Sequence, residues 1–210
     1  MIQHLGKMQK VQLVRRSYWM SLVLTSIFTF MACGGEVAYV PKPRIFPKVE
    51  FPDKSYVLTE SKDLHGAFAL PTYAKLLLDS QNGKPNPGWV NILYTPFNAT
   101  LHLTHYGFKD WILYDSLVED TRKLAYKHLQ RAEDIEEVPT TAIGSKHWGL
   151  IYRIKGNTAT NLNFFLTDSA RNFIRGALYF NQKTSPDSIA PVFEFVEKDI
   201  EEMIKTFDWK

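Results

Sequence analysis

The chain has 210 residues, of which 45% are hydrophobic and 14% aromatic. This length and composition predict one folded domain with a sizeable core and exclude a disordered chain. The formal net charge of +3 at pH 7 is unevenly distributed, because residues 1–32 carry four basic residues and no acid. The rest of the chain holds 21 basic and 22 acidic residues, so it has no excess of positive charge for binding nucleic acid.

The N-terminus has the layout of a secretory signal peptide. The basic pair Arg15 and Arg16 precedes an uncharged stretch at residues 18–32, "YWMSLVLTSIFTFMA". This stretch is shorter than the roughly 20 apolar residues of a transmembrane helix, and the small residue Ala32 ends it. We therefore expect residues 1–32 to be a lipoprotein signal peptide that is removed. An uncleaved membrane anchor is the alternative.

Cys33 is the only cysteine of the chain and directly follows Ala32. Its position resembles the lipobox of bacterial lipoproteins, in which the cysteine thiol is acylated with fatty acids such as palmitate and the cysteine becomes the new N-terminus. Phe30 and Met31 depart from the residues usual there. We predict lipidation at Cys33. A single cysteine also excludes an internal disulfide, so the exported domain depends on its core.

Four prolines within residues 37–52, "VAYVPKPRIFPKVEFP", exclude a helix there. We expect residues 33–52 to form the acylated cysteine and a proline-rich tether that lifts the domain off the membrane. Residues 53–210 are then a single globular domain.

Several segments after the tether show strand or loop patterns. "VEFPDKSYVLTE" (49–60) and "HGAFALPTY" (65–73) predict short extended stretches. "SQNGKPNPG" (80–88) is rich in turn formers and predicts a loop. Apolar and polar residues alternate in "WVNILY" (89–94) and "ATLHLTHY" (99–106), which predicts two paired strands.

Helical spacing follows from Asp110, a candidate N-cap, to about Glu137. The apolar stripe of this predicted helix consists of Leu113, Leu117, Leu124, His128 and Ile135. Three strands of a meander come next, "KHWGLIYRI", "TATNLNFFLT" and "FIRGALYF". A closing helix is predicted after Asp187 or Ser188, with acids on its exposed side and a continuous apolar face formed by Ile189, Val192, Phe193, Val196, Ile200, Ile204 and Phe207.

These elements predict an α+β fold with an antiparallel sheet of five to seven strands and two main helices packed on it. The order of long helix, three-strand meander and closing helix looks like the Mog1/PsbP-type sandwich. A shared fold does not determine function.

The stretch "LTDSARNFIRGALYFN" (166–181) places an Asp, a Ser and two Arg between apolar runs, and it looks more like an active site than any other part of the chain. Asp168 and Ser169 occupy positions typical of an Asx-type turn, and neither a G-x-S-x-G motif nor a nearby histidine supports a serine nucleophile. Arg175 shares a strand face with aromatic residues, so we expect it to be stacked and paired with a carboxylate; contact with a partner is the alternative. Arg171 and Arg175 are our candidates for partner binding.

Metal and cofactor sites are not predicted. His102 and His105 are three residues apart on a predicted strand, so their side chains point to opposite faces. His128 lies on the apolar stripe of a helix, where a core histidine is the usual finding. Acids between Glu119 and Glu137 form charge runs typical of solvated helix faces, yet they leave a paired-carboxylate hydrolase open.

Several stretches together resemble the gliding motility lipoprotein GldD family of Bacteroidetes. These are "EDTRKLAYKHLQRAEDI" (119–135), "NFFLTDSARNFIRGALYFN" (163–181), "PDSIAPVFEFVEKDIEEMIKTFDWK" (186–210), "GWVNILYTPFNATLHLTHY" (88–106) and the lipobox. Many family members carry two cysteines where this chain has Ala67 and Gly88, so a disulfide that other members form there would be missing.

The resemblance implies a non-enzymatic, lipid-anchored component of the gliding motility and type IX secretion machinery, in contact with other envelope proteins. We expect it to face the periplasm, with the outer membrane favoured over the inner. A periplasmic hydrolase acting on peptidoglycan or peptides is the alternative, and a small-ligand binder is a third interpretation.

Overall fold

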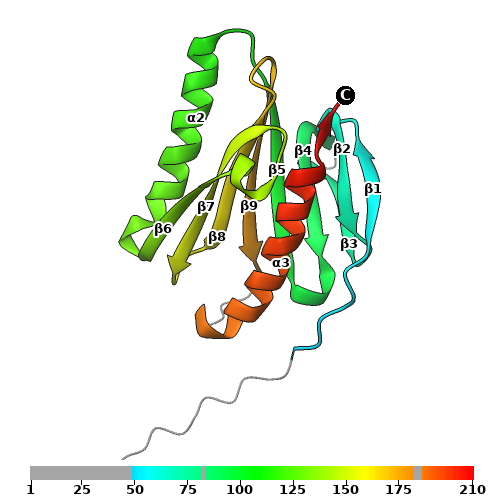
Figure 1. Ribbon diagram of the computed structural model, residues 1–210, viewed down its shortest axis with the longest axis vertical. Coiled ribbons are helices and arrows are strands. Elements are labelled where there is room, and N and C mark those ends of the chain that lie inside the picture. Colours follow the sequence, from blue (N-terminus) through cyan, green and yellow to red (C-terminus); the bar gives the residue numbers. More distant parts are fainter. Residues whose placement is uncertain (1–48, 82–83, 182–185) are drawn as a thin grey trace, which may run out of the picture. The chain divides into compact units, whose positions relative to one another are not determined.

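The structure is a computed structural model that describes residues 49–81, 84–181 and 186–210 (Figure 1). Residues 1–48 lie outside it, so the signal peptide, the lipidation of Cys33 and most of the tether remain predictions. The described residues form two antiparallel sheets and two long helices, which confirms the predicted α+β class. The helices are α2 (Trp111–Tyr126) and α3 (Pro186–Thr206).

The larger sheet has seven strands in the order β3-β4-β5-β9-β8-β7-β6. Its strands are β3 (Ala74–Gln81), β4 (Lys84–Tyr94), β5 (Ala99–Gly107), β6 (Ala132–Pro139), β7 (Trp148–Gly156), β8 (Thr160–Thr167) and β9 (Asn172–Phe180). The smaller sheet consists of β1 (Tyr56–Ser61), β2 (Gly66–Pro71) and β10 (Asp208–Trp209), with β2 in the middle. Short 3₁₀ turns are η1 (Thr95–Phe97), η2 (Lys127–Gln130) and η3 (Thr140–Ile143).

The main core lies between the large sheet on one side and α3 with the small sheet on the other. Ile200 and Ile204 of α3 meet Phe68 of β2 and Leu101 of β5 in this core, and all four side chains are buried. The 3.6-residue spacing of the apolar face therefore folds as predicted. Figure 1 shows α3 crossing the middle of the sheet.

A second, smaller core lies on the opposite face of the sheet, under α2. Phe165 of β8, Phe173 of β9 and Tyr152 of β7 are buried there against Leu117 and other residues of α2. Asp110 caps α2 as predicted, since its carboxylate accepts from the backbone N–H of Leu113 at 2.8 Å. Because α2 packs mainly over β7 and β8, this face of β4, β5 and β9 stays partly uncovered.

The predicted helix to Glu137 is wrong beyond Tyr126. Residues 132–139 instead form β6, an edge strand that pairs with β7. Spacing between Leu124, His128 and Ile135 resembled a helix, but pairing with a neighbouring strand outweighs this weak local preference. His128 consequently lies in η2, outside the helix.

The predicted loop at residues 80–88 is also wrong for its described part. β3 and β4 extend into it, and Ser80 pairs with Pro85 while Gln81 pairs with Lys84. Prolines are tolerated there because β4 gains its second neighbour, β5, only from Trp89 onward. At the closing helix, Asp187 and Ser188 lie inside α3 rather than capping it, a shift of the kind usual at helix ends.

Ala67 and Gly88, the two positions for which the resemblance implies cysteines in other proteins, fall on β2 and β4. Gly88 has a φ of 77°, which a cysteine tolerates poorly. A Cβ at Gly88 would also lie 3.0 Å from the carbonyl oxygen of His105. This backbone therefore suits glycine at position 88.

Candidate functional site

The turn between β8 and β9 is an Asx-type turn, as the sequence predicts. One carboxylate oxygen of Asp168 accepts from the backbone N–H groups of Ala170, Arg171 and Asn172, each at 2.9 Å. Ser169 adopts a left-handed conformation with a φ of 58°. Partial burial opposes ionisation of Asp168, but these hydrogen bonds outweigh it and hold its pKa below the ordinary value.

This turn lies beside the start of α2. The backbone N–H of Phe108, three residues before the helix, donates to the carbonyl of Arg171 at 2.9 Å. Two large apolar side chains at the helix start are exposed, Trp111 by 65% and Ile112 by 84%. We call Trp111, Ile112 and Arg171 the tip. Figure 1 shows the start of α2 and the β8–β9 turn at the end of the domain opposite to where residues 49–53 enter.

The face of the sheet that α2 leaves open contains a groove of about 590 Å³. Its floor comes from β3, β4, β5, β8 and β9, and its wall from α2 and the start of η2. We call it the α2-side groove. Its polar and aromatic lining residues are Asp79, Trp89, Asn91, His102, Thr104, Thr121, Lys127, Asn163, Arg175 and Tyr179.

Arg175 lies in this groove, away from Arg171 at the tip. Its guanidinium is 5.4 Å from the ring centre of Tyr106 and donates to the Tyr106 hydroxyl at 2.9 Å. The predicted stacking is confirmed, but the predicted carboxylate partner is wrong, since no carboxylate of the described residues forms an ion pair with it. The hydrogen-bond partner of Arg175 is the Tyr106 hydroxyl, in place of the carboxylate that we expected from charge pairing.

A chain of hydrogen bonds fixes His102 in the groove. Asn91 donates through its amide nitrogen to Asp79 at 3.0 Å, and its oxygen lies 2.7 Å from Nδ1 of His102. Because an ionised carboxylate only accepts hydrogen bonds, the amide must direct its nitrogen to Asp79 and its oxygen to His102. Nδ1 therefore carries the proton of the neutral ring, which leaves Nε2 as an acceptor.

Burial lowers the pKa of His102, although the Asp79 carboxylate acts in the opposite direction. The neutral, acceptor form is therefore favoured near neutral pH. His105 lies on the other face of β5, as predicted, where its ring is 4.7 Å from that of His65 and its Nε2 is 3.0 Å from the Asn172 side chain. The described residues contain no cluster of three or more acidic, histidine or cysteine side chains that suits a metal.

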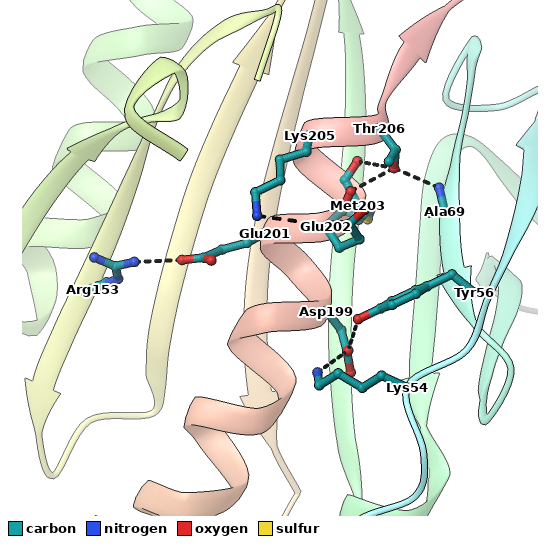
Figure 2. Close-up of polar contacts among 10 residues, drawn as sticks. All are labelled: Lys54, Tyr56, Ala69, Arg153, Asp199, Glu201, Glu202, Met203, Lys205 and Thr206. Atoms are coloured by element: carbon teal, nitrogen blue, oxygen red, sulfur yellow. Dashed lines mark hydrogen bonds and ion pairs between the residues drawn. The ribbon is translucent and has the colours of Figure 1, made fainter. Parts of the chain in front are cut away.

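A buried carboxylate on α3 was missed by the sequence analysis. Asp199 has a fully buried side chain and accepts from Lys54 at 2.5 Å and from the Tyr56 hydroxyl at 2.8 Å, as Figure 2 shows. Tyr73 is a third donor. Burial, followed by the bond to Asp199, raises the pKa of Tyr56 and Tyr73, so both hydroxyls keep their protons. The cluster attaches the first residues of the domain to α3.

Two acids predicted on the exposed side of α3 instead bind an arginine of the sheet. Arg153 of β7 donates to Glu197 at 2.5 Å and to Glu201 at 2.8 Å. Figure 2 shows the contact with Glu201. Burial raises the pKa of Glu197 even though Arg153 favours its ionised form. Acids between residues 119 and 137 also make structural contacts: Glu136 pairs with Arg153 and Glu137 accepts from the Tyr126 hydroxyl.

The family model of the gliding motility lipoprotein GldD matches residues 36–209, nearly the whole described domain. The chain belongs to the gliding motility lipoprotein GldD family. The predicted resemblance is thereby confirmed. A member of this family is a gliding motility component that is anchored to a membrane of the cell envelope.

Among solved structures, the chain is similar to the solution structure of cyanobacterial PsbP (CyanoP) from Synechocystis, with 11% identity and a TM-score of 0.44. That similarity covers 76% of this chain and 95% of the other. No curated protein matches the sequence. Neither α2 nor α3, the long helices in the part of the chain that the structure describes, could cross a membrane.

Proposed function

We propose that this member of the GldD family is a lipid-anchored component of the gliding motility and type IX secretion machinery, held at the membrane through Cys33. It acts by contacts with other envelope proteins and catalyses no reaction. The family match carries this proposal. We place the protein in the periplasm, with the outer membrane favoured over the inner.

The tip is the proposed surface for protein contact. Exposed large apolar side chains that lie together on a surface are typical of interaction sites, and Trp111 and Ile112 are such a pair. Arg171 belongs to the neighbouring turn, which is linked by a backbone hydrogen bond to Phe108 just before α2 and which Asp168 stabilises through three backbone hydrogen bonds. Tryptophan and arginine are enriched at the energetic centres of interfaces. Arg175, the second candidate for partner binding, lies in the α2-side groove and is not part of the tip.

Charge reversal of Arg171 tests the proposal. Its backbone, which makes the structural contacts, is unchanged in Arg171→Glu, so we expect normal folding and a normal amount in the membrane fraction. Gliding on agar and crosslinks to envelope proteins from a photoreactive residue at position 112 should both be lost. Lys198→Glu, an exposed position on α3, is the matched control and should retain both. Unchanged gliding and crosslinking in Arg171→Glu would reject this surface.

A further inference from the structure

The α2-side groove is organised in rows across the sheet. Trp89, Thr104 and Arg175 are paired across β4, β5 and β9. Neighbouring strands are about 4.8 Å apart, so the backbones of Trp89 and Arg175 are separated by roughly 10 Å. The next row contains Asn91, His102, Ala177 and Asn163. Because Ala177 has a small side chain, the floor between His102 and Asn163 is hollow.

Two aromatic rings give this groove exposed flat surfaces. Trp89 is 45% exposed and Tyr179 is 36% exposed, although both belong to strands that have a neighbour on each side in the large sheet. Tyr179 is held by an edge contact with His102 at 5.4 Å between ring centres. Rigid exposed rings of this kind bind flat, partly apolar groups such as the C–H face of a sugar ring.

The polar side chains between the rings suit a ligand with hydroxyl groups. Nε2 of His102 is an acceptor, and it forms no hydrogen bond with the described residues. The Asp79–Asn91–His102 chain fixes this acceptor before a ligand arrives, so little ordering is required on binding. Asn163 accepts from Thr160 through its oxygen, which directs its amide donors elsewhere. An apolar ligand would leave these groups without partners, at a cost in affinity.

Arg175 adds a site for a negative charge. One of its guanidinium nitrogens donates to Tyr106, and the others make no hydrogen bond to the described residues. Lys127 supplies a second cation at the wall of the groove. A carboxylate matches the fork of guanidinium donors in both geometry and charge.

We propose that the α2-side groove binds a sugar that carries a carboxylate. The sugar ring stacks on Trp89, a hydroxyl donates to Nε2 of His102, and the carboxylate accepts from Arg175. Cleavage of a glycosidic bond is not part of the proposal, because retaining and inverting hydrolases use two carboxyl groups and Asp79 is the single acid among the described lining residues. The site is separate from the tip and does not depend on protein contacts there.

Saturation-transfer difference NMR on the full-length protein in detergent micelles tests this binding with three probes. N-acetylmuramic acid has both the sugar and the carboxylate, N-acetylglucosamine has only the sugar, and lactate has only the carboxylate arm. We expect saturation of the N-acetylmuramic acid ring protons and at least about tenfold weaker binding of the other two probes, since each loses a set of contacts.

Variants identify the site. Arg175→Gln should weaken binding of N-acetylmuramic acid by at least about tenfold, because a charge-assisted hydrogen bond is lost. Trp89→Leu should weaken it several-fold by removing the stacking surface. Arg171→Gln at the tip is the matched control and should bind like the wild type. If Arg175→Gln does not fold, Tyr106→Phe removes only the hydroxyl that positions the guanidinium and should also weaken binding.

Three results would overturn the proposal. These are no transfer to N-acetylmuramic acid in the wild type, equal binding by Arg175→Gln, and lactate binding as tightly as the sugar acid. Transfer to an acidic peptide without transfer to any sugar would assign the groove to peptides instead. The Arg171→Glu gliding result is independent of these outcomes, so failure of the groove and failure of the tip are distinguishable.

Discussion

Lys54 donates to the Asp199 carboxylate at 2.5 Å although 145 residues separate the two in sequence. Lys54 also donates to the carbonyl of Phe195 and lies 4.0 Å from the centre of its ring. Phe51, three residues earlier, stacks on the same ring at 4.6 Å between ring centres. The residues that join the domain to its proposed tether are therefore attached to α3, the helix at the centre of the core.

Asp199→Asn should weaken this attachment. Hydrogen bonds to a charged group contribute about 1.5–3 kcal/mol each, so we expect the free energy of unfolding in urea to fall by at least about 2 kcal/mol. Trypsin should also cleave after Lys54 sooner than in the wild type. Glu194→Gln, at an exposed position of the same helix, is the control. Equal stability and equal cleavage of Asp199→Asn and wild type would show that the cluster does not hold the segment.

Ile200 lies at the centre of the main core with no exposed surface, whereas Phe193 is only partly buried at its edge. Ile200→Ala should therefore lower the free energy of unfolding by about 2–5 kcal/mol, the cost of an unfilled cavity, and Phe193→Ala should cost less. Chemical unfolding followed by circular dichroism measures both. Leu58→Ala, which is 74% exposed on β1, should change stability by less than about 0.5 kcal/mol. A Phe193 effect larger than that of Ile200 would contradict this packing.

Local patterns in the sequence predicted much of the fold. A local hydrophobic periodicity predicts each of these elements: the 3.6-residue spacing predicts the apolar face of α3, and the two-residue alternation predicts the strands of the β7–β8–β9 meander and of the β4–β5 pair. The turn at Asp168 follows from side-chain chemistry confined to five residues. β6 was missed because its conformation depends on pairing with β7, which no local pattern reports.

The site was less accessible to prediction because its parts come from distant strands. Asp199 follows Glu197 and precedes Glu201, so in sequence it looks like one more solvated acid. Its burial depends on Lys54 and Tyr56, which fold over it from the other end of the domain. Asp79 and His102 likewise meet only through Asn91. The sequence shows polar residues close to aromatic ones, but this pattern does not specify which side chains meet in the folded protein.

Cys33→Ser tests the lipid anchor. A thioether-linked diacylglycerol cannot form on serine, so the variant lacks the predicted lipid anchor. Since stable anchoring takes two or more acyl chains, the variant should move from the membrane pellet to the soluble fraction after cell lysis. Ser26→Ala, also in the N-terminal segment, is the control. Peptides from residues 1–32 on the mature protein would contradict cleavage before Cys33.

The carboxylate of Asp168 makes a contribution to the free energy of unfolding that depends on pH. Its folded-state pKa is lowered, because its three backbone hydrogen bonds favour the ionised form. A lowered pKa contributes stability that is fully present above the unfolded-state value of about 3.9 and disappears as the pH falls through the folded-state value. Asp168→Asn should therefore be less stable than wild type at pH 6.

The difference between Asp168→Asn and wild type should shrink as the pH is lowered below about 4, where the wild-type carboxyl becomes protonated and neutral like the amide. Urea unfolding at pH 6 and at successively lower pH measures this change. Ser169→Ala is the control for the same turn: its backbone N–H still donates to Thr167, so its stability relative to wild type should not vary with pH. A constant difference for Asp168→Asn across this range would mean that the amide loses packing rather than charge-assisted hydrogen bonds.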